Sequence, residues 1–337
     1  MSWMKKIHPE KPLLLICRRG LGQALRELGF VDIVIEINKG DRNSYKKALY
    51  ELSQYEIINW VCPHNSFRSA LFTWQVEAQN KVGYRQWSTQ FFFDTVIQRD
   101  KRWPESIRLL QIWQNQSDEL KKLLNELSTP DSWIKKSVDN DLQSPPIWAD
   151  PFQFLDLKRV EKLSIEMKIQ ERYPFKNSIV LFPGSVWATK MWKKEKFASL
   201  GNEIQKAGHQ VLIMGGPDEA DLGKWVTSQV PGAHNLCGQS SILESLLLLR
   251  QQKLVIGNDS SSSHMAALMG LPVISFFGPT VLKFGYRPWA QKTRIFEVEG
   301  LKCRPCGAHG PKVCPLGHHR CMNDLNVELK NILSILS

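Results

Sequence analysis

The sequence lacks several features that would each assign the protein to a class. No apolar run reaches the roughly 18 residues that cross a bilayer, and the N-terminal MSWMKKIHPEK has no apolar signal-peptide core. A P-loop, a Gly-x-Gly-x-x-Gly loop and a helix-turn-helix signature are also missing. We therefore expect a cytoplasmic protein that does not bind nucleic acid. In that reducing compartment its seven cysteines should be thiols or metal ligands rather than disulfides.

Acidic residues are the minority among the charges. The chain carries 44 Lys and Arg against 33 Asp and Glu, for a net charge of +11, together with 12 Trp. Such a balance suits an anionic partner, which is a nucleic acid, a membrane surface or an acidic substrate. Because nucleic-acid motifs are absent, an acidic substrate or a membrane surface is the preferred interpretation.

Four short apolar, β-branched runs dominate the C-terminal half. They occupy residues 178–185, 209–216, 253–264 and 271–280, and helical stretches separate the first three. This spacing predicts βαβ units and a parallel sheet, whose ligands bind at the carboxyl ends of the strands. The chain of 337 residues, 42% hydrophobic, is long enough for two cores of ordinary size.

The residues that follow these runs suit an anionic ligand. Asp259 begins a run of four serines that ends at His264, and Lys190 and Trp192 precede a helical stretch. Hydroxyls and backbone N–H groups at a helix start, together with a lysine, could bind a diphosphate, with the indole as an apolar wall. The alternative is that the serines cap a helix and Lys190 is a solvated surface charge.

The N-terminal half predicts further alternating strands and helices. We expect strands at 12–17, 31–37, 56–64, 81–85 and 91–97, and helices at 20–29, 44–52, 65–78 and 104–127. A buried helix is predicted at 241–252, and residues 129–150 are predicted to form a polar connection.

Several separate motifs resemble glycosyltransferase family 9, the bacterial ADP-heptose:lipopolysaccharide heptosyltransferases. The resemblance rests on Pro183-Gly184-Ser185, Lys190-Met191-Trp192, Gly215-Gly216-Pro217, Asn235-Leu236-Cys237-Gly238, Asp259-Ser260 with His264, Phe277-Gly278-Pro279-Thr280, Cys62-Pro63-His64 and Val82-Gly83-Tyr84-Arg85. It implies an α/β fold of the GT-B type, with two Rossmann-like domains facing across a cleft. We place these domains at 1–172, on the acceptor side, and 173–337, which binds the nucleotide sugar.

The resemblance also implies an activity and a set of contacts. The activity is inverting, metal-independent transfer of a heptose or similar sugar, without a cofactor, from a nucleotide-diphosphate sugar to a lipid-linked acidic saccharide. The implied location is the cytoplasmic face of the inner membrane, bound peripherally. The implied donor contacts are Ser185, Lys190, Trp192, Gly216, Asp259, Ser260, Ser261, His264, Gly278 and Thr280, and the implied acceptor contacts are His64, Ser66 and Arg68.

One departure from the family concerns its general base. The family's first strand ends in a loop with Gly-Asp, whereas here Arg18-Arg19-Gly20 follows the strand and no acid occurs before Glu27. A stretch on the order of 30 residues is missing, judged from the usual length of a βαβ unit. The catalytic base is therefore unassigned, with His64 as a candidate. The alternative function is a paralogue that binds nucleotide sugar but transfers it poorly.

The cysteines cluster near the C-terminus. Cys303, Cys306, Cys314 and Cys321 could form a structural zinc site, but the second pair is more widely spaced than in a zinc ribbon. We therefore predict packed or surface thiols, with structural zinc as the alternative.

Overall fold

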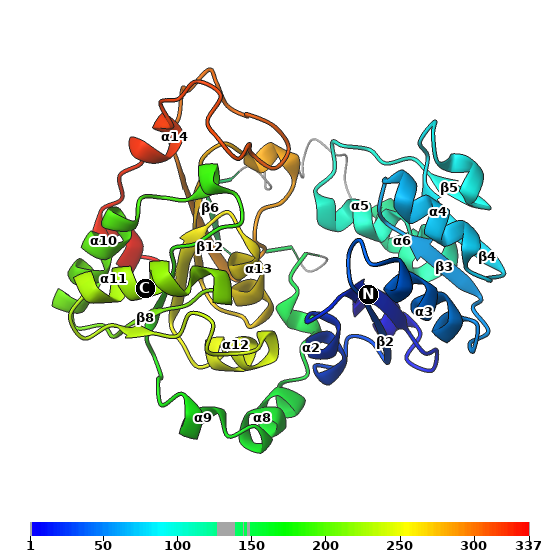
Figure 1. Cartoon of the computed structure of the whole chain (residues 1–337), viewed down its shortest axis with the longest axis horizontal. Helices are drawn as coiled ribbons and strands as arrows, with labels where there is room; N and C mark the ends of the chain where they lie inside the picture. The colour runs from blue at the N-terminus through cyan, green and yellow to red at the C-terminus, as the bar shows by residue number, and fades with distance from the viewer. Residues whose placement is uncertain (1, 127–138, 144, 147–148, 337) are drawn as a thin grey trace. The chain divides into compact units, whose positions relative to one another are not determined.

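The chain forms two compact units, Met1–Ser137 and Val138–Ser337. The structure, a computed structural model, describes residues 2–126, 139–143, 145–146 and 149–336 (Figure 1). Most of the predicted polar connection at 129–150 lies outside the described residues. None of the helices in the described ranges combines the length and apolarity needed to cross a bilayer.

The first unit contains two small parallel sheets. One pairs β1 (Leu14–Arg18) with β2 (Ile33–Ile37), and the other has the order β3 (Asn59–Cys62), β4 (Asn80–Tyr84) and β5 (Thr95–Ile97). The helices are α1 (Ser2–Ile7), α2 (Gly22–Glu27), α3 (Arg42–Leu52), α4 (Phe67–Gln75), α5 (Glu105–Gln111) and α6 (Asp118–Glu126), with 3-10 turns η1 (Gln90–Phe92) and η2 (Gln114–Gln116).

The crossover between β1 and β2 is unusually short. A single helix of six residues, α2, joins the two parallel strands. The helix lies very close to the sheet, because a Cβ on Gly22 would come within 2.3 Å of Val34 Cγ1 and 2.7 Å of Cys17 Sγ. Glycine at this position is thus what allows a tight βαβ unit.

Two predictions in this unit are wrong in part. The Phe-rich run at 91–97 begins as the turn η1, and only Thr95–Ile97 forms a strand. The ring of Phe92 packs edge-on against Phe67 of α4, with centroids 5.6 Å apart, so the run packs as a turn under the helix. The predicted helix at 104–127 is interrupted between α5 and α6.

The second unit is built on one sheet of seven strands. Its order is β6 (Asp141–Gln143), β12 (Lys292–Glu297), β11 (Val273–Phe277), β10 (Leu254–Asn258), β7 (Ile179–Phe182), β8 (Val211–Ile213) and β9 (His234–Asn235). All pairs are parallel except β6 with β12. Strands β7, β8, β10 and β11 are buried along their whole length, as expected of a parallel sheet covered on both faces.

Helices cover the two faces of this sheet. Figure 1 shows α10 (Lys194–Lys206) and α11 (Ala220–Gln229) on one side, and α12 (Ile242–Leu249) and α13 (Ser261–Leu268) on the other. The strand order consequently reverses between β7 and β10. The remaining elements are α8 (Leu157–Glu166), α9 (Ile169–Arg172), α14 (Arg320–Asn323) and α15 (Leu329–Leu333), with turns η3 (Phe152–Phe154), η4 (Ala188–Lys190), η5 (Pro217–Glu219) and η6 (Leu282–Phe284).

The compact units divide the chain earlier than the predicted domains do. The predicted domain boundary lies between residues 172 and 173, whereas the second compact unit begins at Val138. Strand β6 pairs with β12, so residues 141–143 belong to the C-terminal sheet. The pairing joins residues far apart in sequence, and for that reason no local pattern reveals it.

Candidate functional site

Three polar side chains meet at the point where the strand order of the second sheet reverses. Asp259 follows β10, Thr280 follows β11, and Lys190 ends the turn η4 after β7. Asp259 Oδ2 accepts hydrogen bonds from Lys190 Nζ and from Thr280 Oγ1, both at 2.6 Å. The Lys190 and Asp259 side chains are only 12% and 10% exposed. Open parallel sheets bind ligands at this reversal, so these residues mark the candidate site.

The backbone around this group is fixed by a buried amide that the sequence analysis did not single out. Asn258, with no exposed surface, donates from Nδ2 to the carbonyls of Pro183 and Gly184 at 3.0 and 3.1 Å. Its Oδ1 accepts a hydrogen bond from the backbone N–H of Trp192 at 2.9 Å. Asn258 thereby holds both ends of the loop that carries Lys190. The available signal in the sequence was an asparagine at the end of an apolar run, directly before Asp259.

Glu219 is a second residue that the sequence analysis missed. Its carboxylate accepts from the Gly216 N–H at 2.8 Å and lies against Gly184, where a Cβ would come within 1.8 Å of Oε1. The carboxylate therefore lies between the carboxyl ends of β7 and β8, where it can accept hydrogen bonds from hydroxyl groups. Gly184 and Gly215 explain why it fits, because a Cβ on Gly215 would come within 2.5 Å of Oε2. These glycines and the acid just before α11 were the available signal in the sequence.

Of the four serines at 260–263, two are buried and Ser261 is exposed. Ser262 and Ser263 are buried, and Ser263 Oγ donates to the Asn258 carbonyl at 3.4 Å. Ser260 occupies the position before α13 without a side-chain cap, and its Oγ lies 2.7 Å from Ser262 Oγ. Ser261 and His264 are exposed in the first turns of α13. Those two side chains are the accessible ones for a ligand.

Two of the predicted donor contacts, Trp192 and Gly278, are constrained by packing in the core. Trp192 is 4% exposed and packs in the core against Phe197 and Phe276, with its indole N–H donating to the Leu325 carbonyl at 3.0 Å. Its ring is therefore no wall for a ligand. Gly278 is required by packing, because a Cβ there would come within 2.3 Å of Met322 Sδ.

Ser185 and Gly216 each lie three residues beyond the end of a strand, β7 and β8 respectively. Ser185 is half-buried and its Oγ accepts from the Trp187 N–H at 3.4 Å. A Cβ on Gly216 would meet nothing within 4 Å. The loop after β8 is therefore open at Gly216.

The cysteine-rich segment, residues 301–321, forms hydrogen bonds with the loops of this site. Arg304 donates from Nη2 to the Thr280 carbonyl at 2.8 Å and to Glu297 Oε2 at 2.7 Å, and from Nη1 to the Val298 carbonyl at 2.9 Å. The Cys306 N–H donates to the Pro279 carbonyl at 2.9 Å. Residues 304–306 therefore fix the backbone that presents Thr280.

The same segment also contacts the turn before Lys190. His319 Nε2 lies 2.6 Å from the Thr189 carbonyl, and the Thr189 hydroxyl donates to the Pro311 carbonyl. His309 stacks on Trp187, with ring centroids 6.5 Å apart. Residues 301–321 thus contact both the loop after β7 and the loop after β11, a role that their spacing did not indicate.

The four clustered cysteines are free thiols. Within the ranges that the structure describes, no group of three or more His, Cys, Asp or Glu is arranged to hold a metal ion. Burial raises the pKa of Cys321 to about 11. Burial also acts on Cys314, but the backbone N–H groups of residues 316–319 outweigh it and lower the Cys314 pKa.

The candidate acceptor contacts lie together in the first unit. His64, Ser66 and Arg68 are exposed at the carboxyl end of β3 and the start of α4. Ser66 caps α4, because its Oγ accepts from the Ser69 N–H at 3.2 Å. That bond gives Ser66 a structural role, while His64 and Arg68 keep their side chains available.

Comparison with known sequences gives consistent matches. Residues 45–315 match the model of glycosyltransferase family 9 (heptosyltransferase). Lipooligosaccharide heptosyltransferase 2 of Campylobacter jejuni is 31% identical over 177 residues, covering 50% of this chain and 54% of that protein. Lipopolysaccharide heptosyltransferase 2 of Salmonella typhimurium is 22% identical over 249 residues, covering 71% and 64%. The chain thus spans about half the length of the Campylobacter relatives that it matches.

Solved structures agree at the level of the fold. ADP-heptose lipopolysaccharide heptosyltransferase II of Escherichia coli superposes with a TM-score of 0.66 at 18% identity, covering 95% of this chain and 91% of that one. An Escherichia coli heptosyltransferase with ADP gives a TM-score of 0.65 at 15% identity, covering 99% and 93%. The predicted α/β fold of the GT-B type is confirmed.

Proposed function

The chain belongs to glycosyltransferase family 9, and on that premise we propose that it transfers heptose from ADP-heptose to a lipopolysaccharide core acceptor. The observation that carries this proposal is the group formed by Lys190, Asp259 and Thr280 at the reversal of the strand order. This group combines a cation for a diphosphate with a carboxylate for sugar hydroxyls.

The donor site would work through charge and fixed geometry. Lys190 supplies positive charge to the departing diphosphate, and the exposed Ser261 and His264 offer it hydrogen bonds. Asp259 and Glu219 accept hydrogen bonds from donor hydroxyls. Because a lysine neutralises the leaving group in this scheme, the proposed transfer needs no metal ion or cofactor. We propose that it inverts the anomeric carbon, as the resemblance to the family implies.

The acceptor in this proposal is an acidic saccharide linked to lipid. Arg68 can pair with its carboxylate or phosphate, and His64 lies on the same loop. The net charge of +11 favours an acidic partner. We propose His64 and Arg68 as acceptor contacts, with Ser66, which caps α4, beside them.

Such an acceptor would present itself at the cytoplasmic face of the inner membrane, and α4 offers a surface that suits peripheral binding there. Phe67, Leu71 and Trp74 are 59%, 39% and 62% exposed, and their spacing places them on one face of α4. Arg68 lies beside this stripe, and Lys81 donates to the Trp74 carbonyl at its end. Exposed aromatics flanked by cations are typical of helices that lie in an anionic bilayer interface.

A second candidate function follows from the loop after β1. Residues 18–22 contain no carboxylate, so a protein that binds ADP-heptose and transfers it poorly is the alternative. The two functions share the donor site and differ only in turnover.

The deciding experiment measures binding and transfer separately. Calorimetry with ADP, UDP, GDP and their sugars should show selective binding of the adenine compounds. A transfer assay with ADP-heptose and a heptose-deficient lipopolysaccharide should then show product. Binding of none of these nucleotides would overturn the proposal, and binding without product would favour the second candidate.

A further inference from the structure

The two sheets of the first unit each have an open edge. Strand β1 pairs only with β2, and β3 pairs only with β4, so no hydrogen-bonded ladder joins the two sheets. The sheets nevertheless share one core, because Leu14 and Ile16 of β1 and Trp60 of β3 pack against the same cluster of buried residues. A layered α/β domain normally has one continuous sheet over such a core.

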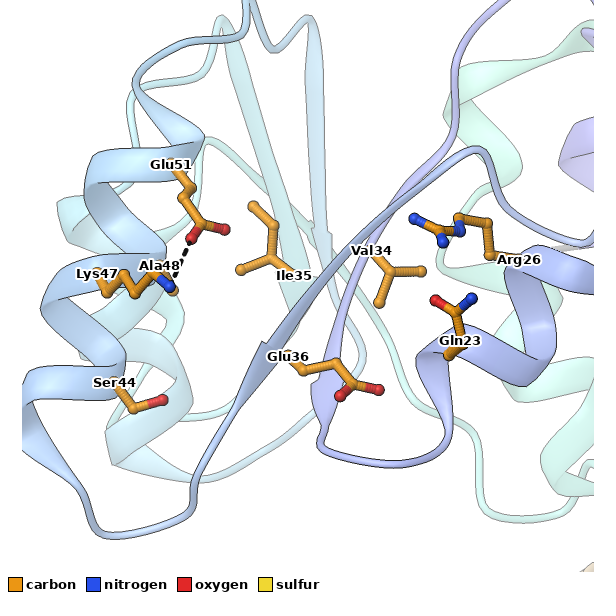
Figure 2. Close-up of a pocket in the computed structure, with 9 residues that line it drawn as sticks. All are labelled: Gln23, Arg26, Val34, Ile35, Glu36, Ser44, Lys47, Ala48 and Glu51. Atoms are coloured by element: carbon orange, nitrogen blue, oxygen red, sulfur yellow. Dashed lines mark ion pairs between the residues drawn. The ribbon is translucent and has the colours of Figure 1, made fainter. Parts of the chain in front are cut away.

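The helices that cover β2 show on which side the second sheet lies. Val34 faces α2, since a Cβ on Gly22 of that helix would come within 2.3 Å of its Cγ1, whereas Ile35 packs against α3. Figure 2, a close-up of the pocket along β2, shows the two helices on opposite sides of this strand. Parallel strands are joined by right-handed crossovers, so crossovers on opposite faces run in opposite directions. Strand β3 therefore lies on the β1 side of β2.

The next crossover continues in the same direction. Phe72 of α4 and Val76 at its end pack in the cluster that contains Ile35, so α4 covers the same face as α3. By the same rule, β4 lies beyond β3, on the side away from β1. The spatial order is therefore β2, β1, β3, β4 and β5, and the open edges of β1 and β3 face each other.

Backbone groups along both of these edges have no partner. Alternate residues of a parallel strand direct their N–H and C=O groups to opposite edges. The carbonyls just before β1 and β3 accept hydrogen bonds from β2 and β4, respectively. The groups that point the other way belong to Leu14 and Ile16 in β1 and to Asn59 and Val61 in β3. Within the ranges that the structure describes, no hydrogen bond reaches these groups.

The side chains of β1 are also less covered than those of an interior strand. Leu14, Leu15 and Ile16 are only half-buried, whereas β7, β10 and β11 of the second unit are buried along their whole length. Parallel strands are normally covered on both faces and read as continuous apolar runs. The sequence of β1 is thus that of an interior strand, although the strand lies at an edge.

We infer that the first unit binds an extended segment of a second polypeptide between β1 and β3, parallel to both strands. The backbone of this segment pairs with both edges and joins the two sheets into one. Because β1 has five residues and β3 has four, a segment of about five residues matches them.

The surroundings define the chemistry of the segment. On one face it meets Ile16 and Trp60, and on the other face Leu15 and Val61, so its side chains are apolar on both faces. A sugar or a lipid lacks the alternating N–H and C=O groups that the two edges require. The partner is therefore a polypeptide strand rich in Val, Ile or Leu.

The probe for this inference is a synthetic peptide with the core Val-Ile-Val-Ile-Val, carrying a short polyethylene glycol chain at each end for solubility. Calorimetry should show saturable binding to the unmodified protein. On binding, the amide N–H groups of Leu14, Ile16, Asn59 and Val61 should exchange with deuterium at least about tenfold more slowly, because each gains a hydrogen-bond acceptor.

Two N-methylated peptides are the matched controls. One carries N-methyl groups on the second and fourth residues of the core, and the other carries them on the first, third and fifth. Each peptide therefore loses its N–H groups along one edge only. A strand inserted between two others uses both of its edges, so each control should bind at least about tenfold more weakly than the unmethylated peptide.

Specific outcomes would overturn the inference. Absence of saturable binding by the unmethylated peptide would exclude it. Weaker binding by only one of the two methylated peptides would contradict it, because a strand added to the outside of a sheet uses a single edge. Slower exchange at Val34 and Glu36, on the outer edge of β2, instead of at Ile16 and Val61 would contradict it as well. The inference does not depend on the proposed function, which ADP calorimetry on the same protein tests separately.

Discussion

Lys190 and Asp259 lie 69 positions apart in the sequence and form an ion pair of 2.6 Å across the reversal of the strand order. Both side chains are nearly buried, so each charge depends on the other for compensation. Thr280 shares the same carboxylate oxygen. A change at any of the three consequently alters both the charge that a diphosphate meets and the stability of the loops.

Replacing Lys190 with alanine should weaken binding of ADP by about 5–150-fold, which corresponds to roughly 1–3 kcal/mol for a hydrogen bond to a charged group. The variant also leaves Asp259 without its cation, so the melting temperature should fall. Calorimetry and thermal unfolding measure the two effects.

Lys206→Ala is the matched control, because Lys206 is exposed in the last turn of α10. It should leave both quantities unchanged. ADP affinity of Lys190→Ala equal to that of the control would contradict the donor site.

Replacing Arg304 with alanine should destabilise the protein by about 3–5 kcal/mol, the range for breaking a buried ion pair. Arg304 is 7% exposed, and its loss leaves Glu297 and the Thr280 carbonyl without their partner. Denaturant unfolding measures the effect. Lys330→Ala, which removes an exposed pair with Glu328, should leave the unfolding midpoint nearly unchanged.

Alkylation with iodoacetamide should label the cysteines in a defined order. The backbone N–H groups around Cys314 lower its pKa despite some burial, so at mildly alkaline pH its thiolate fraction should exceed that of a thiol whose pKa is raised. Burial, and next the Glu219 carboxylate, raise the pKa of Cys237 to about 12, so that thiol should stay unlabelled. Mass spectrometry of timed samples gives the order. Labelling of Cys237 as fast as Cys314 would contradict it.

Protein purified without a metal-affinity step should contain well under one zinc per chain. The reason is that the described cysteines are not arranged as a metal site and that the second pair is widely spaced. Elemental analysis measures the content. Stoichiometric zinc that resists mild chelation would make the cysteine-rich segment a metal-dependent folding element.

Replacing Phe67, Leu71 and Trp74 together with serine should weaken binding to anionic phospholipid vesicles by about 10–100-fold, from roughly 1–3 kcal/mol of lost apolar burial. Co-sedimentation measures the change. Ile165→Ser in α8 is the control, because Ile165 is 71% exposed and lies outside this stripe. Equal vesicle binding by the triple variant and the control would remove α4 from the membrane surface.

Much of the second unit could be predicted from its sequence, because fully buried parallel strands are continuous apolar runs. The same runs placed Asp259 and Thr280 just after their strands, and the structure brings these two together with Lys190 of the turn η4. Local patterns did not determine which way the Trp192 indole turns, since Lys-x-Trp at the start of a helix fits both a surface and a core position. The core position follows from Phe276 and Leu325, which are distant in sequence.

Residues whose role depends on contacts with parts of the chain distant in sequence could not be predicted, because no local pattern shows those contacts. Glu36 is an ordinary residue of a strand until the parallel pairing of β1 and β2 sets it beside Gly20. The interruption between α5 and α6 was missed because apolar spacing continues across it. Arg304 lies in a loop and binds two backbone carbonyls as well as Glu297, and no sequence pattern marks which carbonyls an arginine will bind.

The antiparallel pairing of β6 with β12 decides where the chain can be cut for separate study of its halves. A C-terminal fragment that begins at Tyr173 would lack residues 141–143, so the outer edge of β12 would expose unpaired N–H and C=O groups. It would also lose Asp139, whose carbonyl accepts from the buried Arg287 at 2.6 Å, and Asp141, which pairs with Arg294. A fragment that begins near Val138 keeps all of these, and it is the one expected to stay soluble when expressed alone.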